Sequence, residues 1–132
     1  MSWDVLVQRF SRRYDDISDV PDDGDSLPLG PLLAVRDAIS SSFPGADWSD
    51  PAWGVFDSSA GSVEFNLGDS DPAESLMLHV RASDQIVPKI LSFCSTNGWR
   101  AIDMSTAEFL DKDPFSGIRS WREYSARTAG EA

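Results

Sequence analysis

The sequence predicts a single α+β domain over residues 1–132, with a mostly antiparallel sheet of four to six strands, two main helices on one face and a C-terminal helix. Three observations support this prediction. Apolar and polar residues alternate in several short segments, as they do in half-buried strands. Two longer segments repeat apolar residues every three or four positions, as helices do. Short connections between the middle strands favour antiparallel neighbours.

The clearest strands form a hairpin in the middle of the chain. Residues 63–67 and 76–81 both alternate apolar with polar side chains, and a turn-rich loop separates them. If the apolar positions of the two strands share the core, the simplest register places Glu64 beside His79 and Ser62 beside Arg81. Residues 53–57 read as a neighbouring strand of the same sheet.

The first strand is predicted over residues 2–10, where apolar residues, several of them β-branched, alternate with others. Leu6 and Phe10 make its second face partly apolar, so we expect this strand inside the sheet or beneath another segment. Residues 15–30 follow as a loop that holds six Asp, two Pro and two Gly.

The two main helices are predicted over residues 31–43 and 84–97, each with apolar residues on one face. A proline begins the first helix, and Ser83 is the expected N-cap of the second. Pro88 leaves two alternatives, because proline lacks the amide and crowds the preceding turn. The second helix either begins near Pro88 or is kinked there.

The C-terminal third is expected to finish the sheet and add a helix. Residues 99–103 predict a short strand. Residues 105–110 fit either a helix begun by a capping box or a turn followed by a strand, and we favour the turn and strand. Residues 115–128 predict a helix with one apolar face, and residues 129–132 are expected to fray.

The formal net charge of -11 comes from the first part of the chain. Residues 1–80 hold 15 Asp and Glu against 4 Arg, and the segment from Asp37 to Glu74 has eight acids and no Lys or Arg. Such a region repels a phosphate backbone, so we expect no nucleic-acid partner. The acidity either serves solubility or forms a surface that meets a basic protein.

The sequence also indicates a compartment. Cys94 is the single cysteine, which excludes an internal disulfide and a cysteine-rich metal site, and it falls in the apolar stripe of a predicted helix. The N-terminus is too short and too charged for a signal peptide, and no apolar run is long enough to cross a bilayer. We expect a cytoplasmic protein with no membrane partner, no metal and no cofactor.

The candidate functional residues gather on the polar face of the predicted sheet. They are Asp57, Glu64, Asn66, His79 and Arg81. Carboxylates, a histidine and an arginine on one face could form an acid/base or ligand-binding site. They could equally be ordinary cross-strand pairs on a solvated face. No catalytic motif accompanies them, so the sequence assigns no catalytic residue.

Trp48 completes the set of candidate binding residues. It lies with Trp53 and Phe56 among several Asp residues just before the hairpin, and such a segment can form part of a sugar- or peptide-binding surface. The alternative places Trp53 and Phe56 in the core and leaves Trp48 exposed.

Five segments resemble a family of uncharacterised small acidic bacterial proteins of similar length. They are SWDVLVQ (2–8), DWSDPAWGVFD (47–57), VEFNLG (63–68), LMLHVR (76–81) and GWRAID (98–103). The resemblance spans most of the chain and coincides with the predicted strands. It implies a bacterial, cytoplasmic, single-domain protein, and it transfers no function and no site residue.

These features together favour a non-enzymatic acidic binding protein that engages a basic protein partner, with immunity to a toxin as the most concrete version. The alternative is a small-molecule binder or an enzyme that uses the polar sheet face around His79. That alternative predicts a concave pocket bounded by the candidate residues. The sequence leaves the oligomeric state open.

Overall fold

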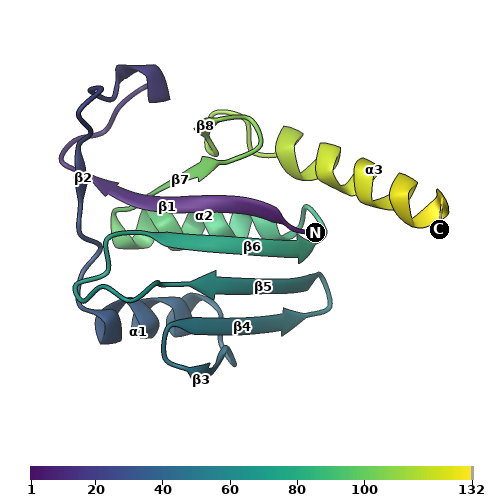
Figure 1. The fold of residues 1–132 in the computed structure, drawn as a ribbon, viewed down its shortest axis with the longest axis horizontal. Helices are drawn as coiled ribbons and strands as arrows, with labels where there is room; N and C mark the ends of the chain where they lie inside the picture. Colours follow the sequence, from purple (N-terminus) through teal and green to yellow (C-terminus); the bar gives the residue numbers. More distant parts are fainter. Residues whose placement is uncertain (132) are drawn as a thin grey trace.

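The computed structural model describes residues 1–131, with side chains as far as residue 127, and has the α+β fold that the sequence predicts (Figure 1). In chain order the elements are β1 (Trp3–Phe10), the 3-10 turn η1 (Ile17–Asp19), β2 (Ser26–Leu27), α1 (Leu32–Ser42), β3 (Asp47–Asp50), β4 (Trp53–Ser58), β5 (Gly61–Asn66), β6 (Leu76–Ala82), α2 (Ile86–Asn97), β7 (Arg100–Asp103), β8 (Glu108–Phe109) and α3 (Ser116–Glu131).

The strands form one antiparallel sheet in the order β3-β4-β5-β6-β1-β7-β8, with β2 paired to β1. The sheet has eight strands, so the predicted four to six were too few. The two unpredicted strands, β2 and β3, consist of mostly exposed residues without apolar alternation, because they lie at the margins of the sheet. The segment 15–30 is therefore a loop interrupted by η1 and β2.

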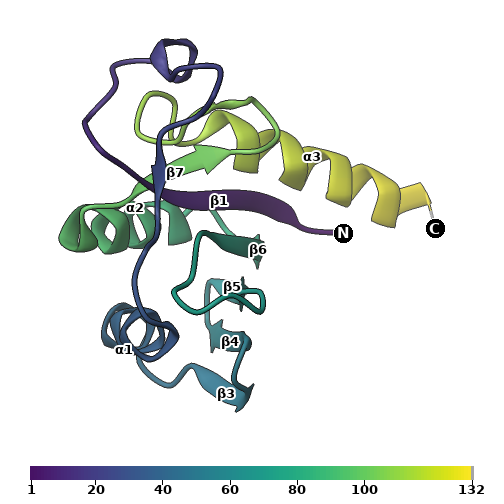
Figure 2. The same cartoon turned by 60° about the vertical axis from the view of Figure 1, so that its left-hand side comes forward.

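The main core lies between the sheet and the helices α1 and α2, which Figure 2 shows on the same side of the strands. Phe43, at the end of α1, is its centre. The Phe43 ring meets Phe56, Phe65 and Phe93 edge-on, with ring centroids 5.2, 4.9 and 5.6 Å apart. Such edge contacts between aromatic rings add to the energy of area burial. The core thus joins α1 and α2 to β4 and β5.

A smaller cluster lies on the opposite face of the sheet, around β1 and β7. Tyr14, Ile102 and Phe109 are buried there, and Leu6 and Phe10 of β1 pack against them. This arrangement explains why β1 is apolar on both faces, as the sequence indicated. The strand lies between β6 and β7, and the segment after it folds back across its second face.

The ends of the helices agree with the sequence except in their caps. Pro31 is the N-cap of α1 rather than its first residue. Gln85, not Ser83, is the N-cap of α2, because a turn formed by the backbone of residues 83–87 leads into the helix. Pro88 lies in the first turn of α2, where a backbone amide would have no acceptor within the helix, so the proline costs no hydrogen bond. The helix therefore begins near Pro88.

The C-terminal region follows the favoured prediction of a turn and a strand, since β8 pairs with β7. The helix α3 extends to Glu131 and is longer than the predicted 115–128. Its backbone is helical over part of the segment 129–132 that was expected to fray, and Ala132 lies outside the described residues.

Candidate functional site

One face of the sheet carries no helix over β4, β5 and β6, and we call it the open sheet face (Figure 1). Strand alternation places a row of half-exposed side chains on it, because successive residues point to opposite faces. Its central members are Asp4, Trp53, Glu64, His79 and Arg81. Four of the strands, β1, β4, β5 and β6, each contribute at least one of them.

The predicted hairpin register is confirmed. Glu64 lies opposite His79, and Ser62 lies opposite Arg81. The Glu64 carboxylate pairs with the Arg81 guanidinium through Oε2 and accepts a 3.1 Å hydrogen bond from Trp53 Nε1 through Oε1. The hydrogen bond from Arg81 and, to a smaller extent, the hydrogen bond from Trp53 hold the pKa of Glu64 below its ordinary value. Glu64 is therefore an ionised group fixed by two donors.

His79 is held as firmly as Glu64. Its Nδ1 lies 2.9 Å from Oδ1 of Asp4, and its ring stacks on the Trp53 indole with centroids 5.4 Å apart and an interplanar angle of 14°. Ser2 Oγ donates a 2.6 Å hydrogen bond to the same oxygen of Asp4. Asp4 is a site residue that sequence reasoning missed, since only the pairing of β1 with β6 brings it opposite His79.

Two further candidates share this face without joining the cluster. Asp57 is exposed near the end of β4, opposite Ser62. Asn66 lies between Trp53 and Met77, and its Oδ1 accepts a 3.0 Å hydrogen bond from the backbone of Gly68. That bond closes a turn and leaves the amide with a local structural role.

Trp48 lies on the other side of the sheet. Its ring packs against Phe65 in the core, and its Nε1 donates a 3.1 Å hydrogen bond to Ser40 Oγ of α1. The alternative with Trp53 in the core and Trp48 exposed is therefore wrong for both tryptophans, although Phe56 is buried as expected. Trp53 replaces Trp48 as the aromatic residue of the candidate site.

Exposed carboxylates line the same half of the sheet, and we call them the acidic border. They are Asp47 and Asp50 on β3, Asp57 on β4, and Asp69, Asp71 and Glu74 in the connection between β5 and β6. Among the side chains of residues 1–127, none of the six forms an ion pair. Their charge is thus left facing solvent.

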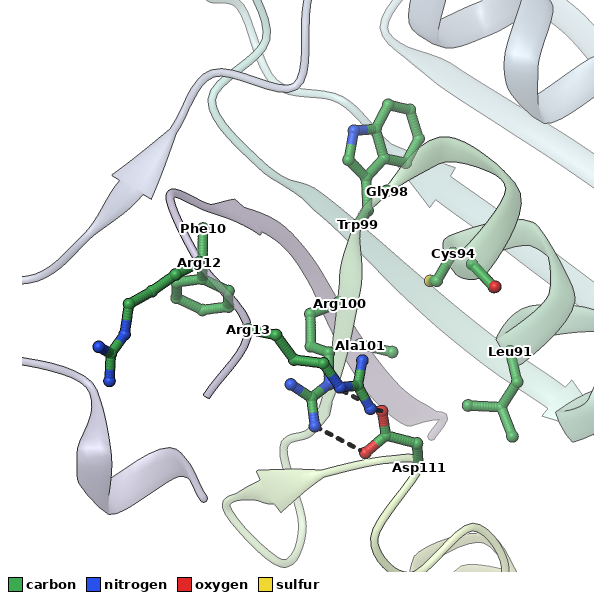
Figure 3. Close-up of a pocket in the computed structure, with 11 residues that line it drawn as sticks. Phe10, Arg12, Arg13, Leu91, Cys94, Gly98, Trp99, Arg100, Ala101 and Asp111 are labelled. Atoms are coloured by element: carbon green, nitrogen blue, oxygen red, sulfur yellow. Dashed lines mark hydrogen bonds and ion pairs between the residues drawn. The ribbon is translucent and has the colours of Figure 1, made fainter. Parts of the chain in front are cut away.

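A cavity of about 510 Å³ lies away from this face, between α2 and the segments around residues 10–13 and 99–101 (Figure 3). Its polar end is a network in which Arg100 donates to both oxygens of Asp111, at 2.7 and 2.9 Å, and Arg13 adds a 3.2 Å contact. Arg100 also donates a 2.8 Å hydrogen bond to the carbonyl of Tyr14, and its guanidinium carbon lies 3.8 Å from the centroid of the Phe109 ring. Arg100 is therefore a buried cation whose charge is paired with Asp111.

A second cavity, of about 490 Å³, lies on the other side of Trp99 and is lined by residues that include Arg9, Leu29 and Val35. Neither cavity includes Asp57, Glu64, Asn66, His79 or Arg81. The Asp4–His79 pair could act as a general base only if a substrate were held beside it in a concave pocket. Neither of the two cavities includes this pair.

The remaining chemistry of the described residues is limited. Burial raises the pKa of the Cys94 thiol to about 12, which makes it a poor nucleophile. No group of three or more His, Cys, Asp or Glu within residues 1–127 is arranged to hold a metal ion. None of the helices described has the length and apolarity needed to cross a membrane.

No family model matches the chain, and neither a curated protein nor a solved structure matches it.

Proposed function

We propose that this is a non-enzymatic binding protein whose open sheet face and acidic border engage a basic protein partner. The observation that carries the proposal is the combination of a fixed aromatic cluster, Trp53 stacked on His79, with six exposed carboxylates that have no ion-pair partner among residues 1–127. A basic toxin neutralised by its immunity protein is the most concrete version of such a partner.

The composition of the open sheet face supports protein binding. Trp53, Met77 and His79 are half-buried, and Arg81 is exposed beside them. Aromatic residues, Met and Arg are enriched in the centres of protein interfaces, where a few of them supply most of the binding energy. A face built from four strands, whose candidate residues line neither cavity, suits a protein surface better than a small ligand, which needs a concave site.

The contacts within the cluster also favour tight association. Trp53 is held by a hydrogen bond to Glu64 and by its stack on His79. Glu64 is fixed by its ion pair with Arg81, and His79 by its 2.9 Å contact with Asp4. Side chains that are already ordered lose little rotamer entropy on binding. The cluster can therefore serve as a rigid anchor around which the partner packs.

The acidic border supplies the electrostatic part of the proposal. Exposed charges of one sign attract an oppositely charged protein and speed its docking, and salt screens this attraction. The pairing of Glu64 with Arg81 neutralises these two charges at the centre of the face, while the rim stays negative. A partner with a basic rim and an apolar centre fits this pattern.

The test compares capture of partners from a lysate of the host at low salt by four forms of the protein. These are the wild type, Trp53→Ser, the triple variant Asp47→Asn/Asp50→Asn/Asp69→Asn, and the matched control Asp15→Asn/Asp19→Asn/Asp22→Asn in the distant exposed loop. We expect one basic protein on the wild type and on the control, with weaker retention on Trp53→Ser and loss of salt dependence on the border variant. Equal recovery by all four folded forms would refute the proposal.

A further inference from the structure

The cavity beside Trp99 has the size of a ligand site. Its volume of about 510 Å³ falls in the range of small-molecule pockets, roughly 300–1,000 Å³. It lies at the end of the sheet near the C-terminus of α2, apart from the open sheet face. Both cavities that flank Trp99 meet at Gly98 and Trp99.

The walls of this cavity differ in chemistry. Leu91 and Cys94 of α2, together with Ala101 and Trp99, form an apolar wall (Figure 3). Phe10 and Arg12 lie on the opposite wall, and the end is polar, with Arg13 and Arg100 converging on Asp111. Apolar surface with a few converging polar groups is the usual composition of a ligand pocket.

The balance of charge in the cavity is the reverse of that in the protein. Arg12, Arg13 and Arg100 line it with Asp111 as the sole carboxylate among its lining residues, in a chain whose net charge is -11. Arg100 is buried and satisfies both oxygens of Asp111, so these two neutralise each other. The guanidinium of Arg13, 72% exposed, then leaves a surplus positive charge at the mouth.

We propose that the cavity binds a small amphipathic organic anion. Its apolar body lies against Leu91 and Trp99, and its single anionic group accepts hydrogen bonds from Arg13. A guanidinium pairs with a planar carboxylate or a sulfonate through two parallel hydrogen bonds, and such charge-assisted bonds are stronger than neutral ones. A cation is excluded by the surplus positive charge, and a wholly polar anion would leave the apolar wall unfilled.

The probes are 8-anilinonaphthalene-1-sulfonate, an apolar body with one anionic group, and N-phenyl-1-naphthylamine, which has the same body without the charge. Binding to the folded protein is measured by fluorescence titration, and stoichiometry by calorimetry. We expect saturable one-to-one binding of the sulfonate and at least about tenfold weaker binding of the neutral compound, because a charge-assisted bond contributes about 1.5–3 kcal/mol.

Two variants and a matched control locate the site. Ser95 is exposed on α2 and lines the cavity, so Ser95→Trp should fill its mouth and weaken sulfonate binding at least about tenfold. Ser92 is also exposed on the same helix and is not among the lining residues, so Ser92→Trp should bind as the wild type does. Arg13→Gln should reduce the affinity for the sulfonate and leave that for the neutral compound unchanged.

Three results would overturn the proposal. They are equal affinity for the two compounds, unchanged binding by Ser95→Trp, and the absence of saturable binding. Circular dichroism and the thermal midpoint of each variant verify that the compared proteins are folded. Trp53→Ser should bind the sulfonate normally, which separates this site from the partner surface.

Discussion

The indole nitrogen of Trp3 donates a 3.0 Å hydrogen bond to Oδ1 of Asp103, inside the protein and across 100 positions of the sequence. Asp103 is only 1% exposed, and the same oxygen accepts bonds from the backbone nitrogen and the hydroxyl of Ser105, at 2.9 and 2.6 Å. A buried carboxylate needs such donors, because burial without them is costly. The pair thus fixes the beginning of β1 against the end of β7.

Replacing Trp3 with Phe should destabilise the fold by about 1–3 kcal/mol more than the loss of ring area alone, since Asp103 would lose a donor while staying buried. Urea unfolding followed by circular dichroism measures the change. Trp48→Phe is the matched control, because Trp48 donates to the partly exposed hydroxyl of Ser40. Equal losses for the two variants would contradict the special role of Asp103.

Replacing Gly117 with Ala should also be destabilising, by about 2 kcal/mol or more, although alanine normally favours a helix by about 1 kcal/mol over glycine. A Cβ at position 117 would lie 1.9 Å from Oδ2 of Asp103, which is closer than atoms can approach. The double variant Gly117→Ala/Asp103→Ala removes the contacts with the carboxylate and leaves only the hydroxyl of Ser105, 2.7 Å from the added Cβ. A double-mutant cycle in urea should therefore show strong coupling, and additive losses would argue against the contact.

The Cys94 thiol should be unreactive in the folded protein. With its pKa raised by burial from 9.0 to about 12, it keeps its proton where an unfolded thiol has lost it. Its contribution to stability is therefore complete below pH 9.0 and is lost as the pH rises toward 12. Ellman's reagent should label the thiol only in denaturant, and the urea midpoint of Cys94→Ala should fall less above pH 9.0 than that of the wild type. Rapid labelling of the native protein would show that the Cys94 thiol is neither buried nor held in its protonated form.

The contribution of Glu64 to stability should show the opposite pH dependence, since it is lost at acid pH. Its pKa is lowered by the bonds from Arg81 and Trp53, so its contribution to stability is present above the ordinary value of 4.5 and is lost as the pH falls through the lowered pKa. The difference in urea midpoint between the wild type and Glu64→Gln should shrink as the pH is lowered from 6 to about 3. Asp69→Asn, an exposed position outside the cluster, is the control, and a difference that stays constant with pH would disprove the role of the ion pair.

The local features of the fold follow from the sequence, because alternation along a strand determines both which residues face the core and which residues can pair. The hairpin register of Glu64 with His79 was predictable for this reason. A start of α2 near Pro88 was one of the two alternatives that the chemistry of proline allowed. The hydrophobic pattern of β1 even indicated its position inside the sheet.

The rest depends on contacts between distant segments. Asp4 joins the site because β1 pairs with β6, and strand order cannot be derived from alternation. Trp53 and Phe56 lie three positions apart in β4, so alternation allows only one of them to face the core, and that residue is Phe56. Trp48 reaches the core from β3, whose pairing with β4 is irregular between Asp47 and Asp50. The cavity beside Trp99 was missed because its lining comes from four separate segments.

The central position of β1 has a consequence for synthesis of the chain. Val5 pairs with Leu78 on one side and with Asp103 on the other, so both neighbours of β1 are made long after it. Until they leave the ribosome, β1 exposes two unpaired edges, which are the surfaces through which strands of different chains join. A nascent chain stopped before β7 should thus be prone to aggregation, because β1 would then lack the strand that pairs with one of its edges.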